Sequence, residues 1–348
     1  MGERKIKSIE STSIGKTSRK NDDGIYTGEN FVAVIDGVSH KSTIKIDGKE
    51  IKIANIITEA IKKIDSPSAP VYAKELTFEE FVIFINMYIK KYLDNMNFPL
   101  QERMLEATGA IYSKYYNQIW LVGDCRAIYD KCALEHELKI DKVYEDIRAK
   151  VIETLLEAGY TQEQLLENDI SKPIIANSED IPQYIKKEQV AKELQEYITD
   201  TMKQTLLHSG FTEQDITEQH LLEKYNNPRK LQEYLKNNPN AGEYGYSVFN
   251  GIKTEPKNCR VQDLPKDVKK IKLFSDGFPT NILNNDKDLG YAIRQNRKLA
   301  QKDPLGINEN KTVRNAVRQS EREKFLAIDD YSAVCFKIEY LKERDDER

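Results

Sequence analysis

Short apolar runs recur along the chain and predict the strands of a sheet. Four of these runs are rich in β-branched and aromatic residues and have the length of a strand: 31–35, 119–122, 271–274 and 332–336. A shorter run at 110–112 is joined to the second of them through a polar segment, as in a hairpin. Before them, residues 1–48 alternate between extended and turn-like segments, so strands are expected at both ends of the chain.

Apolar residues at helical spacing predict two helices near the N-terminus, at 51–64 and 77–92. Pro67 and Pro70 separate them, as expected for a loop. We expect both helices to cover one face of a sheet. A closing helix is expected at 313–325, just before the last strand.

The middle of the chain is almost entirely helical in pattern and contains an internal repeat. The segment IRAKVIETLLEAGYTQEQL at 147–165 matches ITDTMKQTLLHSGFTEQDI at 198–216. In each copy a glycine, Gly159 or Gly210, is suited to end one helix, and the threonine two residues later can cap the next. Because two copies are fewer than a solenoid needs, we interpret the repeat as a duplicated helical hairpin within an insertion.

Composition narrows the class of protein. The chain has 348 residues, of which 39% are hydrophobic and 32% charged, and no apolar run approaches the length of a membrane span. The N-terminus is polar and lacks the apolar core of a signal peptide, so we expect a cytoplasmic protein with no membrane partner. Lysine and arginine are dispersed and the formal net charge is -4, which argues against nucleic acid as a partner. The four cysteines form no CxxC pair and are expected to be reduced.

Aspartates stand at or beside the ends of the predicted strands. They are Asp22 and Asp23, Asp36, Asp124, Asp276, and Asp329 with Asp330. A carboxylate at the end of a buried strand contributes little to packing. If these strand ends meet in the fold, the carboxylates form a cage of hard oxygen ligands suited to Mg²⁺ or Mn²⁺.

The order and surroundings of these aspartates resemble the motifs of the metal-dependent type 2C protein phosphatases. Asn-Asp-Asp at 21–23 is similar to the family's Asn-Glu-Asp, and Val-Ile-Asp-Gly-Val at 34–38 to its Val-x-Asp-Gly-Val/His. Four further segments also resemble family motifs, at 107–110, 122–126, 275–278 and 329–334. The resemblance covers about residues 5–135 and 245–340 and leaves the helical repeat outside.

This resemblance implies an α+β fold, a four-layer α-β-β-α sandwich of two antiparallel sheets flanked by helices, with a helical insertion. It also implies a centre of two Mn²⁺ or Mg²⁺ ions at one edge of the sheets. By position, Asp36 would bridge the two ions, Asp276 and Asp329 would complete one coordination shell, and the carbonyl of Gly37 would serve the other. Asp22 would act mainly through bound water.

Several positions depart from the family pattern. The phosphate-binding arginine of the family falls at Ser18, so we take the neighbouring Arg19 as the candidate phosphate ligand. Asp22 stands where the family commonly has glutamate, which is one methylene longer. Asp124 matches a ligand of a third, weaker metal site, but Thr280 replaces the partner aspartate of that site, which argues against a third ion.

The resemblance predicts a phosphoprotein phosphatase acting on phosphoserine or phosphothreonine, with Asp36, Arg19 and Asp22 as catalytic residues. Paired cations lower the pKa of a bridging water, which then attacks the phosphorus atom of the ester. A non-catalytic, phosphatase-like binding or regulatory protein and a small-molecule phosphoesterase remain as alternatives.

The resemblance also divides the chain. Residues 1–137 and 244–341 are expected to form the phosphatase-like domain, and 342–348 a charged tail. Residues 138–243 are expected to form the helical insertion, at the position of a smaller flap in the family. The insertion is interpreted as an enlarged flap that selects substrate or binds a protein partner, or as a passive cover for a sheet edge.

Overall fold

The computed structural model describes residues 4–14, 21–38, 41–99, 105–136, 138–168, 181–185, 187–276 and 331–340. These residues form two compact units. The first unit contains the described residues before 137 together with 247–276 and 331–340, and the second contains those of 138–246. The candidate aspartates that the structure describes all lie in the first unit.

Two five-stranded sheets form the centre of the first unit, and all their pairings are antiparallel. The β1 sheet has the order β1 (Arg4–Ile14), β12 (Tyr331–Tyr340), β11 (Lys270–Phe274), β8 (Arg126–Tyr129) and β9 (Cys132–Glu135). The β3 sheet has the order β10 (Arg260–Asp263), β7 (Gln118–Val122), β6 (Ala107–Ser113), β3 (Phe31–Gly37) and β2 (Gly24–Thr27). The expected pair of antiparallel sheets is therefore confirmed.

Strand β3 shows how these layers are held together. Successive side chains of a strand point to opposite faces, and in β3 both faces are apolar. Phe31 and Ile35 lie in an apolar cluster with α1 and α2, whereas Val32 and Val34 lie in a second cluster with residues of the β1 sheet. All four are fully buried, which explains why this strand appears in the sequence as a continuous apolar run.

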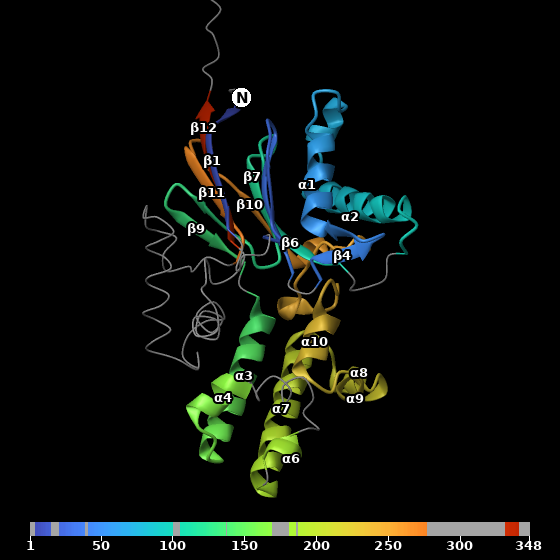
Figure 1. Cartoon of the computed structure of the whole chain (residues 1–348), viewed down its shortest axis with the longest axis vertical. Coiled ribbons are helices and arrows are strands. Elements are labelled where there is room, and N and C mark those ends of the chain that lie inside the picture. The colour runs from blue at the N-terminus through green and yellow to red at the C-terminus, as the bar shows by residue number, and fades with distance from the viewer. Residues whose placement is uncertain are drawn as a thin grey trace, which may run out of the picture. The chain divides into compact units, whose positions relative to one another are not determined.

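Two helices cover the outer face of the β3 sheet, as Figure 1 shows. They are α1 (Ile53–Ile64) and α2 (Phe78–Asp94), close to the ranges predicted from apolar spacing. Helix α2 begins with a capping box, in which Thr77 and Glu80 each accept a hydrogen bond from the other's backbone N–H. Trp120 of β7 packs under this helix, with its ring centroid 5.1 Å from that of Phe81.

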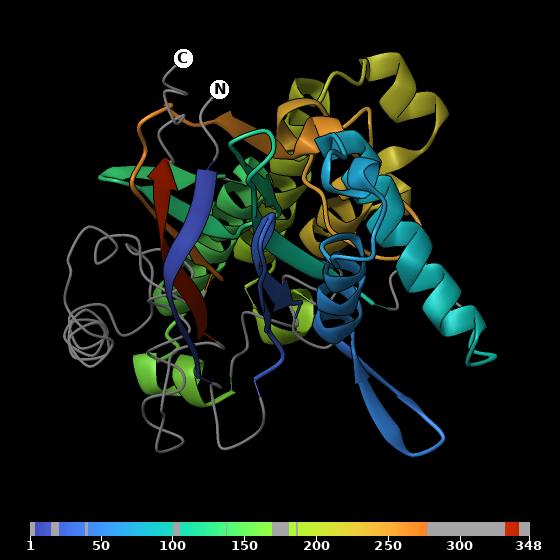
Figure 2. The ribbon, with the colours of Figure 1, turned by 90° about the horizontal axis from the view of Figure 1, so that it is seen from above.

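A two-stranded hairpin, β4 (Thr43–Ile46) and β5 (Lys49–Lys52), separates β3 from α1. Asp47 and Gly48 form its turn, both with positive φ (50° and 75°), as an Asp-Gly hairpin turn requires. In Figure 2 the hairpin, in blue, projects from the first unit. Three layers of the expected sandwich are thus described, whereas the closing helix expected at 313–325 lies outside the described residues.

The second unit is helical over its described residues. Its α-helices are α3 (Lys139–Glu157), α4 (Gln162–Asn168), α6 (Ile181–Tyr184), α7 (Glu188–His208), α8 (Glu213–Glu218), α9 (Leu221–Lys224) and α10 (Pro228–Leu235), and a 3-10 helix, η3 (Gly242–Tyr244), follows them. Both copies of the sequence repeat form a helix, a turn and a second helix, with Gly159 and Gly210 at φ 98° and 94°. Among the described helices of either unit, none combines the length and apolar content needed to cross a bilayer.

Candidate metal centre

Three aspartates from different strand ends meet in the first unit. Asp36 is the second-last residue of β3, Asp124 lies in the turn between β7 and β8, and Asp276 follows β11. Each offers one carboxylate oxygen, and these three oxygens all lie within 4.8 Å of one another. Because β3 and β11 belong to different sheets, the cluster exists only when the two sheets are packed together.

Gly123 brings Asp124 close to Asp36. Gly123 has a φ of 78°, and a Cβ atom built on it would lie 2.2 Å from Cγ2 of Thr108. Thr108 is in turn the register partner of Asp36 across the β3–β6 ladder. The β7–β8 turn is therefore pressed against the strand position opposite Asp36, in a conformation that a glycine adopts without strain. His136 contacts the same turn, with Nδ1 3.1 Å from the carbonyl oxygen of Gly123, and burial lowers its pKa.

A pair of fully buried serines fixes the position of Asp276. Ser275 donates its backbone N–H to the carbonyl oxygen of Ser332 at 3.0 Å, and Ser332 donates its N–H to Ser275 Oγ at 2.9 Å. The next amide, that of Asp276, donates to Oδ2 of Asp36 at 3.3 Å. The Ser275-Asp276 segment thus links the end of β11 to the end of β3, and it also carries the Asp276 carboxylate.

The cluster carries an excess of negative charge. Burial raises the pKa of Asp36 well above its ordinary value, and the charges of Asp23, Asp276 and Asp124 raise it further. Burial and the charge of Asp36 also raise the pKa of the neighbouring Cys125 thiol. A divalent cation would relieve this repulsion, and a set of carboxylate oxygens is the donor set that Mg²⁺ and Mn²⁺ prefer. The residues present therefore fit such an ion.

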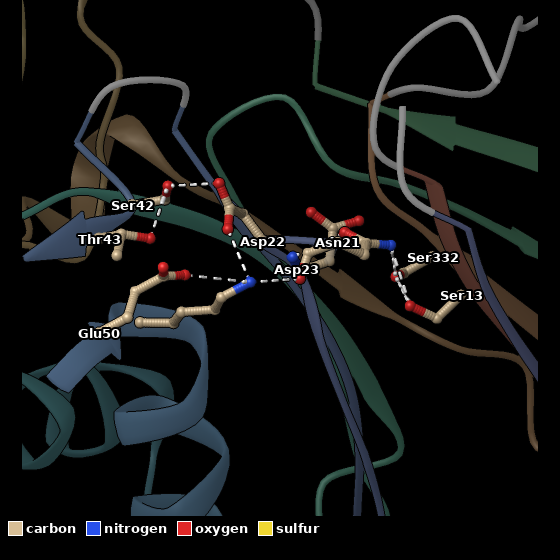
Figure 3. A network of polar contacts seen from close by, with 9 residues as sticks. Ser13, Asn21, Asp22, Asp23, Ser42, Thr43, Glu50 and Ser332 are labelled. Carbon is tan, nitrogen blue, oxygen red and sulfur yellow. Dashed lines mark hydrogen bonds and ion pairs between the residues drawn. The ribbon is translucent and has the colours of Figure 1, made fainter. Parts of the chain in front are cut away.

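The two carboxylates of the Asn21-Asp22-Asp23 segment have different surroundings. The carboxylate of Asp22 pairs with Lys52, at 2.8 Å, and accepts a hydrogen bond from Ser42 at 3.0 Å (Figure 3). Asp23, by contrast, is 8% exposed, and its charge helps to raise the pKa of Asp36. The sequence analysis selected Asp22 and assigned no role to Asp23, because the burial of each side chain depends on the contacts of this turn.

The other predicted site residues are placed as follows. Gly37 ends β3, and a Cβ atom on it would lie 2.9 Å from the backbone oxygen of Asp22, so the two segments approach closely there. Asp124, which the sequence assigned only to a third metal site, lies directly with Asp36 and Asp276. Asp329 and Arg19 lie outside the described residues.

No family model and no curated protein matches the sequence. Solved structures similar to the chain are PPM-type serine/threonine phosphatases. The catalytic domain of PstP, in complex with two manganese ions, is 13% identical with a TM-score of 0.38, over 97% of this chain and 100% of that one. Stp1 from Staphylococcus aureus is 11% identical with a TM-score of 0.41, over 99% and 98%. MsPP from Mycobacterium smegmatis, in complex with cacodylate, is 10% identical with a TM-score of 0.38, over 97% and 100%.

Proposed function

We propose that the chain is a metal-dependent phosphoester hydrolase. The observation that supports this most directly is the meeting of Asp36, Asp124 and Asp276, whose carboxylate oxygens lie within 4.8 Å of one another. Like-charged groups so close together are unfavourable unless protons or cations compensate them. Their convergence from separate strand ends is therefore more simply explained by a bound cation than by packing.

In this proposal Asp36 is the central ligand. It accepts a hydrogen bond from the amide of Asp276, and its pKa is raised by burial and by the surrounding charges. Asp124 and Asp276 would hold the cation from the β7–β8 turn and from the end of β11. When bound, Mn²⁺ or Mg²⁺ would supply an activated water and neutralise charge on the phosphate oxygens.

The remaining residues of the proposed centre are assigned from the sequence resemblance. Asp329 and the carbonyl of Gly37 are proposed as further ligands for a pair of ions, Asp22 as an outer group, and Arg19 as the phosphate ligand. The substrate is proposed to be a phosphoserine or phosphothreonine protein, with residues 138–243 as an insertion that binds substrate or a partner. Hydrolysis of a small phosphoester and a non-catalytic binding role are the competing possibilities.

Mn²⁺-dependent hydrolysis of p-nitrophenyl phosphate tests the proposal. Asp36→Ala and Asp276→Ala are expected to lower kcat/KM by about 100-fold or more, because even outer partners of metal ligands are worth 10–100-fold. Asp200→Ala, which removes an exposed aspartate from α7 in the second unit, is the matched control and should retain parental activity.

Two outcomes would count against the hydrolase. One is a parent protein that binds Mn²⁺ but is no more active than Asp36→Ala, which would favour the non-catalytic binding protein. The other is equal activity with and without Mn²⁺. Rates on phosphopeptides and on small phosphate esters, compared under the same conditions, would then distinguish a protein phosphatase from a small-molecule phosphoesterase.

A further inference from the structure

Lys52 is a buried lysine that contacts the Asn21-Asp22-Asp23 segment. It is the last residue of β5, immediately before α1, and is 8% exposed. Its Nζ atom lies 2.8 Å from Oδ1 of Asp22 and donates to the backbone oxygen of Asn21, also at 2.8 Å. Burying an ammonium group costs free energy unless the group is paired and hydrogen-bonded. These two contacts therefore stabilise the Lys52 ammonium group at this position. Glu50, at 3.9 Å, adds a weaker ionic contact.

The base of the β4–β5 hairpin provides a second contact to the same carboxylate. Ser42 Oγ donates to Oδ2 of Asp22 at 3.0 Å, and the backbone oxygen of Ser42 accepts the N–H of Ile53 at 2.9 Å. Thr43 is the register partner of Lys52, so the hairpin places Ser42 and Lys52 at the same end. Both oxygens of Asp22 are thus held from the hairpin, as Figure 3 shows.

Asn21 is held from the opposite direction. Its Nδ2 donates to Oγ of Ser13 at 2.9 Å and to Oγ of Ser332 at 3.2 Å, on strands β1 and β12 (Figure 3). Its Oδ1 accepts the backbone N–H of Asp23 at 2.8 Å. The turn at 21–23 is therefore fixed on one side by the hairpin and on the other by the β1 sheet, and it lies against the end of β3, where a Cβ atom on Gly37 would lie 2.9 Å from the backbone oxygen of Asp22.

We propose that Lys52 is a positioning residue of the metal centre. By holding Asp22 and the Asn21 carbonyl, it keeps the 21–23 turn, with its buried Asp23, against the end of β3 that carries Asp36. Asp22 anchors the lysine in addition to serving as the outer group proposed above. This inference rests on the metal centre proposed above, and it does not require that the centre hydrolyse a phosphoester.

Mn²⁺ binding in the absence of substrate tests this role. Free Mn²⁺ is measured by its EPR signal during titration of the full-length parent, Lys52→Met, Lys52→Arg and Lys45→Met. Lys52→Met is expected to weaken Mn²⁺ binding about tenfold, the effect typical of losing an outer-shell partner of a metal site. Lys52→Arg should restore most of the affinity, because arginine can still pair with Asp22. Lys45→Met removes an exposed lysine from the same hairpin and should bind as the parent does.

Melting temperatures of the metal-free proteins separate positioning from simple stabilisation. A lysine with only a structural role would lower the melting temperature of Lys52→Met and leave the Mn²⁺ affinity of the folded protein unchanged, and that result would overturn the inference. If Lys52→Met does not fold, Ser42→Ala decides, because it removes the other contact to Asp22 with a small change in volume. Parental Mn²⁺ affinity in Ser42→Ala would then equally overturn the inference.

The hydrolase proposal can fail separately. A protein that binds Mn²⁺ in a Lys52-dependent way but hydrolyses no phosphoester would retain the positioning role and lose the catalytic one. A hydrolase whose Mn²⁺ affinity is the same in Lys52→Met and Lys45→Met would lose the positioning role alone.

Discussion

At the scale of single residues, the candidate centre combines groups that repel one another in the absence of a cation. Asp36 shows this repulsion most clearly, since both burial and three neighbouring carboxylates raise its pKa. A carboxyl group whose pKa is higher in the folded than in the unfolded protein contributes most to stability at low pH. That contribution is lost as the pH rises from the ordinary value of 3.8 through the folded-state value.

Asp36→Asn should therefore stabilise the metal-free protein and impair metal binding. At neutral pH each unit of pKa elevation costs the folded state roughly 1 kcal/mol, and the amide removes this cost while its oxygen can still accept the hydrogen bond from Asp276. We expect a higher melting temperature than the parent at pH 7 without metal, a smaller difference toward pH 4, and no stabilisation by Mn²⁺. Asp200→Asn is the control for loss of an exposed charge, and a lower metal-free melting temperature for Asp36→Asn would contradict this account.

At the scale of elements, the turn between β7 and β8 determines where Asp124 lies. Gly123→Ala would introduce a Cβ atom at φ 78° and 2.2 Å from Thr108. Gly48 in the β4–β5 turn has a similar φ of 75°, but a Cβ atom there would have no neighbour within 4 Å. Comparing alanine substitutions at these two glycines therefore separates the stability cost of backbone strain from that of steric contact.

Gly48→Ala is expected to cost about 1 kcal/mol of stability, from the left-handed conformation alone. Gly123→Ala is expected to cost about 2 kcal/mol or more, because overpacking adds to that strain. Displacement of the turn should also weaken Mn²⁺ binding in Gly123→Ala only. Urea unfolding and Mn²⁺ titration of both variants measure these effects, and equal Mn²⁺ affinities would argue against Asp124 as a ligand.

The elements also show which parts of the fold are predictable. The long buried strands and the two amphipathic helices were recognised, because apolar runs and helical spacing are strong signals. Four-residue strands such as β8 and β10 were missed, since so short a segment carries too little periodicity. The β4–β5 hairpin was missed although its Asp47-Gly48 turn is a recognisable signal. That omission also concealed Lys52, whose proposed positioning role depends on the register of the hairpin.

At the scale of the whole molecule, the sequence order of the aspartates predicted that distant segments would meet. Asp36 and Asp276 do so because β3 and β11 lie in the two sheets that share a core. The direction of side chains within the 21–23 turn was not predictable, because it follows from contacts to β1, β12 and the hairpin. Sequence patterns thus indicated which strand ends converge, whereas tertiary contacts decide the surroundings of each carboxylate in the 21–23 turn.

Because the chain divides into two units, we expect Mn²⁺ to raise the thermal stability of one unit and not of the other. The described members of the centre all belong to the first unit, which also contains the single tryptophan, Trp120, fully buried under α2. Tryptophan fluorescence therefore follows unfolding of the first unit, while far-ultraviolet circular dichroism also detects the helices of the second. At 100 times its Kd, Mn²⁺ should stabilise the first unit by about 2.7 kcal/mol, and Asp276→Ala should abolish that shift. We expect the fluorescence transition to move to higher temperature and a separate helical transition to stay in place. Equal shifts of both signals would instead mean that the two units unfold together, as one cooperative structure.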